Sequence, residues 1–271
     1  MKTRIIAAAA LLPLLLIIVL VLPGVYTGIL FGLIAALGAY ELLWGTGLVR
    51  HPSLIVCSSV MAFLVALWSC FGMPYPAALI GTLVFAGVLY AQMLASKGQI
   101  TFTKLAICLA AGMLIPFMLT ALVRLHSGEN GRLLILIPFI LAFSSDTGAY
   151  FTGSAIGKHK LAPSISPQKT VEGVVGGVVC AVIGMMVYCV VLQLAFQFRV
   201  NYIYGIIYGL LGSLAAVFGD LCFSAVKRQT GIKDYGNLIP GHGGVLDRFD
   251  SMSLVAPLTE ALLLLIPVVV K

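Results

Sequence analysis

Glycine, histidine and charged residues concentrate in the segment 239–250, IPGHGGVLDRFD, within a chain that is otherwise strongly apolar. A glycine-rich backbone lets a ligand approach closely, and the N–H groups of such loops can bind phosphate. His242 could bind phosphate, act in proton transfer, or be a loop histidine with no special role. The glycines concerned are Gly241, Gly243 and Gly244. The composition indicates a site for a phosphorylated ligand, although plain turns also use glycine.

Two aspartates follow the glycines. Asp247 and Asp250 are three residues apart, so a continuous helix would place both carboxylates on one face. Two unpaired acids side by side repel each other, and a hard cation between them relieves that repulsion. Arg248 would point elsewhere, toward phosphate or a partner acid. The spacing therefore predicts a divalent-cation site close to a phosphate site.

A second polar stretch, FGDLCFSAVKRQTGIKD, precedes the glycine loop. Asp220, Ser224 and Lys227 share one face if a helix continues through all three. A carboxylate at the end of an apolar helix is costly unless it is paired or bound to metal. An anchoring ion pair between Asp220 and either Lys227 or Arg228 would explain the same pattern, so a structural role and a functional role both stay open.

Two more polar groups lie earlier in the chain. Asp146 ends an apolar run and is either a site acid or a helix-end group bonded to nearby serines. In SPQKTVEGVVGG, Ser166 and Pro167 predict an N-cap and first helical residue, with free N–H groups facing an anion. Lys169 adds a positive charge, and Glu172 enters the next apolar stretch. Capping and membrane anchoring are the alternative explanation.

The elements that must position these residues are membrane helices. The 271 residues are 61% hydrophobic and only 9% charged, with a mean hydropathy of +1.12, whereas soluble domains carry roughly 25% charged residues. We expect an all-α, polytopic integral membrane protein with one membrane domain over 1–271, in which 1–131 forms spans of unclear role and 132–271 carries the catalytic spans and loops. A bilayer core needs about 20 apolar residues per helix, and nine stretches qualify: 5–22, 25–48, 53–71, 75–95, 104–123, 132–152, 171–195, 202–223 and 252–270.

Composition also excludes several classes of protein. The N-terminal apolar run can span a bilayer and no clear cleavage site follows it, so we expect a retained helix rather than a signal peptide. The six cysteines form no CxxC pair, which argues against a disulfide framework and a zinc site. The net charge of +7 is explained by the Lys and Arg that membrane proteins collect in cytoplasmic loops, so we expect no nucleic-acid partner.

The basic residues predict the orientation. With a cytoplasmic N-terminus, Arg124, Arg132, Arg199 and Lys271 lie outside, which leaves twelve of the 16 inside. All four polar stretches then face the cytoplasm, and together they provide the acids, cations and glycines that phosphoryl or nucleotidyl transfer requires. An ion-coupled transporter would also contain intramembrane acids, but it tends to show repeated halves and a site near the midplane.

The stretch from Ser224 to Ser251, SAVKRQTGIKDYGNLIPGHGGVLDRFDS, resembles the signature of the CDP-diacylglycerol synthases, also called phosphatidate cytidylyltransferases. That pattern combines a serine, a Lys-Arg pair, Lys-Asp, Pro-x-His-Gly-Gly and Asp-Arg-x-Asp, and every element is present. DTGAYFTG and SPQKTVEG resemble two further segments of the family. The resemblance implies an enzyme of the bacterial cytoplasmic (inner) membrane that uses CTP, phosphatidate and Mg²⁺. It leaves open a second cation, a homodimer, and the nearer alternative of a CTP-dependent lipid kinase.

The resemblance also implies a role for each matching residue. The metal-centre residues would be Asp220, Asp247 and Asp250, which with Lys227 and His242 make up the expected catalytic group. The phosphates would be held by Lys227, Arg228, Lys233, His242 and Arg248. CTP or the lipid head would contact Ser224, Gly241, Gly243 and Gly244. The same site would be lined by Asp146, Lys169, Thr170 and Glu172.

Overall fold

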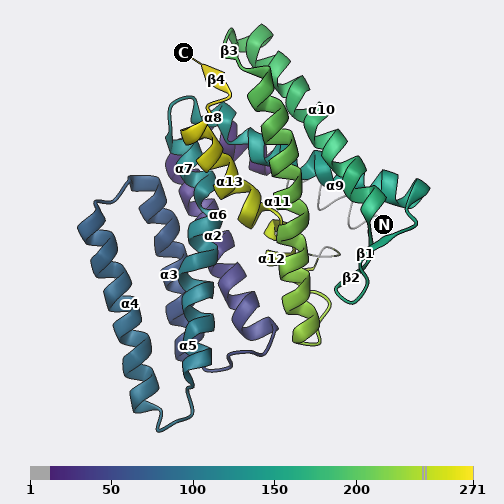
Figure 1. Ribbon diagram of the computed structural model, residues 1–271. Coiled ribbons are helices and arrows are strands. Elements are labelled where there is room, and N and C mark those ends of the chain that lie inside the picture. Colours follow the sequence, from purple (N-terminus) through teal and green to yellow (C-terminus); the bar gives the residue numbers. More distant parts are fainter. Residues whose placement is uncertain (1–12, 240, 242, 271) are drawn as a thin grey trace. The chain divides into compact units, whose positions relative to one another are not determined.

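The computed structural model describes residues 13–239, 241 and 243–270, and it is predominantly helical (Figure 1). Residues 13–20 are helical. The later helices are α2 (Gly24–Tyr40), η1 (Glu41–Gly45), α3 (Pro52–Phe71), α4 (Tyr75–Ala95), α5 (Phe102–Leu109), η2 (Ala110–Leu114), α6 (Ile115–Leu119), α7 (Ala121–Ser127), α8 (Gly131–Leu134), α9 (Leu136–Ile156), α10 (Val171–Phe196), α11 (Tyr202–Gln229), α12 (Leu246–Phe249) and α13 (Met252–Leu265). The strands are β1 (Lys160–Ala162), β2 (Ser166–Thr170), β3 (Arg199–Val200) and β4 (Val269–Val270).

Seven helical segments of the described chain are long and apolar enough to cross a membrane. They are Gly24–Gly45, Pro52–Phe71, Tyr75–Ala95, Phe102–Ser127, Gly131–Ile156, Val171–Phe196 and Tyr202–Gln229. The all-α polytopic fold is therefore confirmed, but the predicted count of nine is not. Residues 5–12 of the expected first span, 5–22, lie outside the described residues. The expected span 252–270 contains only the 14 residues of α13, with Pro257 inside it, which is short of the roughly 20 that a bilayer core requires.

The chain folds as two compact units. Unit 1 comprises 1–132 and 229–249, and unit 2 comprises 133–228 and 250–271. In unit 1, α2 packs on α3 where glycine meets a larger side chain. A Cβ on Gly28 would lie 2.9 Å from Cys70, and a Cβ on Gly32 would lie 2.8 Å from Phe63. Close approach of helix backbones is a common way for membrane helices to pack. That the whole chain acts as one membrane domain stays a prediction.

Unit 2 is built on α9, α10 and α11, again with glycine at the contacts. A Cβ on Gly148 of α9 would lie 2.5 Å from Cys180 of α10, and a Cβ on Gly209 of α11 would lie 2.6 Å from the Cα of Val182. The backbones therefore approach too closely for a larger side chain at these positions. Two short antiparallel ladders complete the unit, β1 with β2 and β3 with β4.

The expected helix start at Ser166 is wrong. Ser166–Thr170 forms strand β2, with Lys160 opposite Thr170 and Ala162 opposite Ser166. Helix α10 begins only at Val171, and its N-cap is Thr170, whose Oγ1 accepts the N–H of Gly173 at 3.1 Å. Serine and proline are as compatible with a hairpin strand as with a helix start, and the pairing with β1 decides between them.

Candidate functional site

The described part of unit 2 contains a group of acids and lysines that we call the acid–lysine cluster. Its members are Asp146, Lys169, Asp220, Ser224, Lys227 and Asp250. Its centre is Asp220 on α11, whose Oδ2 pairs with the Nζ of Lys169 at 2.6 Å. The other oxygen, Oδ1, accepts the hydroxyl of Ser224 at 3.0 Å. Asp146 of α9 lies within electrostatic range of both Asp220 and Lys169. Residues far apart in sequence are thus brought together around one carboxylate.

The periodicity of α11 explains part of this arrangement. Asp220, Ser224 and Lys227 all lie within the helix, as the sequence predicts, and Ser224 and Lys227 are buried. The pairing of Asp220 with Lys169 of β2 was not among the pairs that the sequence suggested. Arg228, one of the suggested partners, donates its Nε to the carbonyl of Ile165 at 3.1 Å. Arg228 therefore contacts the turn of the β1–β2 hairpin.

Asp250 follows α12. Its backbone packs against α11, and its side chain interacts electrostatically with the other acids of the cluster. A Cβ on Gly219 of α11 would lie 2.9 Å from the carbonyl oxygen of Asp250, so only glycine allows this approach. The N–H of Ser251 donates to Oδ1 of Asp250 at 2.7 Å. Burial raises the pKa of Asp250 from 3.8 to about 7, and the charges of Asp220 and Asp146 add to the rise. Ser251 and Lys227 oppose it. The cluster thus brings three carboxyl groups together with two lysines, and its acids raise one another's cost of ionisation.

The raised pKa of Asp250 predicts a pH dependence of stability. The folded protein binds this proton more tightly than the unfolded chain, so stability falls as pH rises from about 3.8 to about 7 and changes little above that. In buffer with a chelator, the apparent melting temperature of the purified protein should therefore decrease between pH 5 and 7. Asp250→Asn should flatten this slope, while Glu129→Gln, at an exposed loop position, should retain it. An unchanged slope in Asp250→Asn would refute the assignment.

Thr170 and Glu172 have structural contacts at the hairpin. Thr170 is buried and caps α10. Glu172 accepts the backbone N–H of Lys158 at 3.1 Å and that of His159 at 3.2 Å, and its Oε1 pairs with Nδ1 of His159 at 2.5 Å. Glu172 thereby holds the residues that precede β1, and Thr170 joins the end of β2 to the start of α10. Whether they also line a substrate site stays a prediction.

Unit 1 contains the glycine-rich segment, and buried carboxylates hold its backbone. We call the described residues of this segment, 235–239, 241 and 243–247, the braced loop. Oδ2 of Asp247 accepts the N–H of Tyr235 at 2.8 Å and that of Gly244 at 3.0 Å. Glu41 accepts the N–H of Val245 on Oε1 at 2.9 Å. Its Oε2 accepts the N–H of Leu246 at 2.8 Å.

The braced loop corrects one expectation and leaves another untested. The N–H of Gly244 donates to Asp247, and whether Gly244 also contacts a substrate stays a prediction. Asp247 and Asp250 do not share a helical face, because α12 ends at Phe249 and the two residues belong to different units. The periodicity argument assumed a helix longer than the four residues that form. The remaining predicted residues are placed as follows: Gly241 and Gly243 have positive φ (76° and 84°), Lys233 and Arg248 are exposed, and His242 lies outside the described residues.

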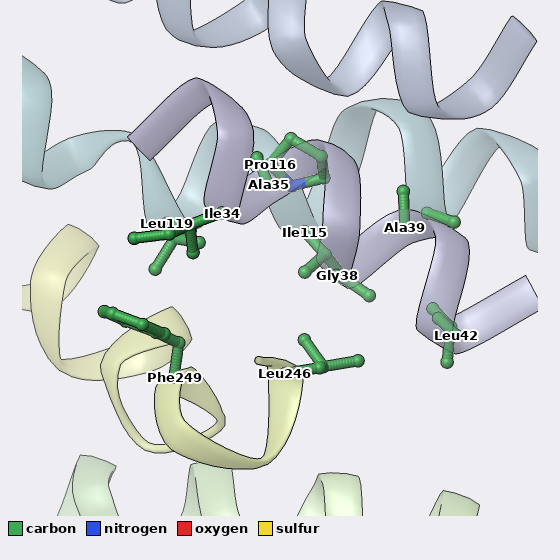
Figure 2. Close-up of a pocket in the computed structure, with 11 residues that line it drawn as sticks. Ile34, Ala35, Gly38, Ala39, Leu42, Ile115, Pro116, Leu119, Leu246 and Phe249 are labelled. Carbon is green, nitrogen blue, oxygen red and sulfur yellow. The ribbon is translucent and has the colours of Figure 1, made fainter. Parts of the chain in front are cut away.

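Helix α12 packs within unit 1 through apolar side chains. Leu246 and Phe249 point toward residues of α2 and α6 (Figure 2), and the ring of Phe249 meets that of Phe31 edge-on at 6.1 Å. The cavity between them measures about 10 Å³, which is roughly the least that a single water requires. The packing of Leu246 and Phe249 anchors the end of the braced loop. The cavity beside these side chains is too small to bind a substrate.

Glu41 is a residue that the sequence analysis did not assign. It lies where α2 passes into the π-helical segment η1, and π-helical turns occur frequently at functional sites. The available signal was a single acid inside the apolar stretch 25–48, which is costly unless the acid is partnered. Its partners are 204 and 205 residues away in the chain, so no local pattern could have identified them.

The donor chemistry of the acid–lysine cluster suits a hard divalent cation. Carboxylate oxygens are the ligands that Mg²⁺ prefers, and Asp146, Asp220 and Asp250 act on one another electrostatically. Among the described residues, no group of three or more His, Cys, Asp or Glu side chains is already arranged to hold a metal. Asp247, also predicted as a ligand, lies in unit 1, and its Oδ2 already accepts two N–H groups.

The fold and the site first define a class: an integral membrane protein of apolar helices with a cluster of acids and lysines among them. The model of the cytidylyltransferase family matches residues 2–266, nearly the whole chain. The chain therefore belongs to the cytidylyltransferase family.

Relatives from several bacteria agree with this assignment. A phosphatidate cytidylyltransferase of Staphylococcus epidermidis is 33% identical over 273 residues, which cover 97% of this chain and 99% of the relative. One from Staphylococcus haemolyticus shows the same identity and coverage. The phosphatidate cytidylyltransferase of Haemophilus influenzae is 37% identical over 158 residues, covering 56% of this chain and 55% of the relative. The resemblance that the motifs suggested is thus confirmed at the level of the family.

Proposed function

We propose that the protein transfers CMP from CTP to phosphatidate, giving CDP-diacylglycerol and pyrophosphate. In this reaction an oxygen of the phosphatidate phosphate bonds to the α-phosphorus of CTP. The bond from that phosphorus to the oxygen bridging to the β-phosphate breaks, and pyrophosphate leaves with the electron pair. Two observations support the proposal. The relatives are named phosphatidate cytidylyltransferases, and the acid–lysine cluster joins acids of the membrane helices to Lys169 of β2. The cluster is the observation that carries it.

The residues of the cluster can meet the main demand of this reaction, which is to bring two anions together. A phosphate monoester is already a nucleophile, so positioning and charge neutralisation should dominate the rate. Lys169 and Lys227 would hold phosphate oxygens. Asp220 fixes the Nζ of Lys169 through their 2.6 Å ion pair, and Ser224 fixes Asp220 in turn. The lysine is thereby oriented before substrate arrives.

Mg²⁺ is part of the proposal. Oxygens of Asp220 and Asp250 would hold it, with Asp146 nearby. When bound, the ion would neutralise charge on the triphosphate. Burial is the main cause of the raised pKa of Asp250, and the nearby charges of Asp220 and Asp146 add to it; a cation would offset that second contribution. A second cation stays open.

We further propose that the site faces the cytoplasm, in the inner membrane of a bacterium. The positive-inside distribution of Lys and Arg in the sequence supports this orientation. CTP is too highly charged to enter hydrocarbon, while phosphatidate keeps its acyl chains in the bilayer. Their phosphates can therefore meet only near the membrane interface.

A product assay tests the proposal. Purified protein receives phosphatidate and CTP labelled at the α-phosphate, with and without Mg²⁺. We expect label in a CDP-lipid, release of pyrophosphate, and dependence on the cation. Supplied instead with diacylglycerol and CTP labelled at the γ-phosphate, a lipid kinase would give labelled lipid phosphate and CDP. A transporter would give no nucleotide product, so either outcome would replace the proposed reaction.

A further inference from the structure

We infer that Glu41 is a positioning residue for the proposed nucleotidyl transfer, acting by holding the backbone of the braced loop at Val245 and Leu246. This inference rests on the proposed function for its catalytic consequence. The contact itself is independent of that function. Glu41 is 4% exposed and comes from the end of α2, far from the glycine-rich motif in sequence.

Both oxygens of Glu41 are used by the backbone of the loop. Oε1 accepts the N–H of Val245 at 2.9 Å, and Oε2 accepts the N–H of Leu246 at 2.8 Å. Hydrogen bonds to a carboxylate are roughly twice as strong as neutral ones. A carboxylate whose two oxygens already accept N–H groups is suited to fixing main chain rather than contacting a substrate.

The loop carries glycine where Glu41 approaches it. A Cβ on Gly244 would lie 2.6 Å from Oε2 of Glu41, and a Cβ on Gly236 would lie 2.7 Å from Oε1. Neither distance is compatible with a real side-chain carbon. Two glycines of the loop are therefore explained by the carboxylate beside them, without reference to a ligand.

Asp247 completes the arrangement from within the loop. Its Oδ2 accepts the N–H groups of Tyr235 and Gly244, which lie at opposite ends of the glycine-rich turn. Glu41 and Asp247 together fix four backbone N–H groups by carboxylate. The exposed Arg248 follows the loop directly. Removing Glu41 should loosen the end of the loop next to Arg248.

The first test is hydrogen–deuterium exchange with wild-type protein and Glu41→Gln. In the variant one carboxylate oxygen becomes an NH₂ group, which must face a backbone N–H, so at least one of the two bonds is lost. We expect faster exchange in peptides covering Val245 and Leu246, with the rest of the chain unchanged. Glu129→Gln, an exposed acid of the same unit, should exchange as wild type. Unchanged exchange in the loop, or faster exchange throughout the protein, would overturn the positioning role.

Activity provides the second readout. Misplacing a positioned group by about 1 Å can lower activity on the order of 100-fold, and we expect a loss of up to that size in Glu41→Gln, measured well below its melting temperature. If wild-type protein forms no CDP-lipid while the local exchange result holds, the proposed function fails and the loop contact stands. If wild type is active and Glu41→Gln retains full activity, the catalytic consequence is refuted.

A pair of variants keeps the inference testable if Glu41→Gln folds poorly. Gly244→Ala should lower activity because its Cβ collides with Glu41. The same substitution made in Glu41→Ala should cost less than it does in wild type, because the space is then open. Gly87→Ala, where no atom lies within 4 Å of the added carbon, is the glycine control. Equal costs of Gly244→Ala in both backgrounds would contradict direct contact.

Discussion

Asp220→Asn is expected to lower kcat by on the order of 10²–10³-fold, the range for loss of one preorganised electrostatic contact, while the protein remains folded in the membrane. Asp220 binds Lys169 at 2.6 Å and Ser224 at 3.0 Å. Asparagine keeps the shape and can still accept the serine hydroxyl, but it removes the charge that orients Lys169. The substitution also replaces a charged carboxylate ligand of the proposed Mg²⁺ with a neutral amide.

The measurement is the rate of CDP-lipid formation with purified protein, at several Mg²⁺ concentrations. Ser224→Ala serves as a graded comparison, because it removes one neutral donor to Asp220 and should cost less. Glu129→Gln controls for the loss of any acid. Near-normal turnover in Asp220→Asn would show that the acid–lysine cluster is an anchoring arrangement, which is the alternative that the sequence left open.

The sequence predicts the membrane helices well because their signal is continuous. A bilayer requires about 20 apolar residues whatever the surrounding structure, so the stretches 75–95 and 171–195 nearly coincide with α4 and α10. The last expected span, 252–270, is also strongly apolar but does not form one long helix. Helix α13 ends at Leu265, and the residues after it pair as β4 with β3. Hydropathy alone does not distinguish these outcomes.

The candidate site is predicted less completely, because its contacts depend on tertiary structure. The spacing of Asp220, Ser224 and Lys227 within one helix follows from helical periodicity. The ion pair with Lys169 depends on a hairpin that the sequence suggested was the start of a helix. Periodicity also failed for Asp247, because α12 has only four residues. Local patterns predict positions within an element, and they do not predict which elements meet.

Two single glycines, Gly244 and Gly219, also show that local sequence does not reveal tertiary contacts. The sequence attributes Gly244 to phosphate binding, since glycine exposes backbone N–H groups. In the structure its N–H donates to Asp247, and its missing Cβ leaves room for Glu41. Gly219 likewise leaves room for the backbone of Asp250. Both glycines allow segments that are distant in sequence to pack closely within one unit. No single segment of sequence reveals such a contact.

Lys169→Met is expected to lower kcat by about 100-fold and also to lower the melting temperature, because Asp220 then loses its ion-pair partner near Asp146 and Asp250. Both charges of the pair are about three-quarters covered by protein, and removing one partner of such a pair destabilises more than removing both. Lys169→Arg, which keeps the charge, should retain more of both activity and stability.

The double variant Lys169→Met with Asp220→Asn separates the two effects. Its melting temperature should exceed that of Lys169→Met, since no unpaired carboxylate remains at position 220. Its kcat should be no lower than that of the worse single variant, because residues acting as one unit do not multiply their losses. Fluorescence-detected melting gives the melting temperatures and CDP-lipid formation gives kcat, each measured on wild type, the two single variants and the double variant. Losses that multiply would show that Lys169 and Asp220 act independently, and the ion pair would then be a contact of the resting enzyme without a part in turnover.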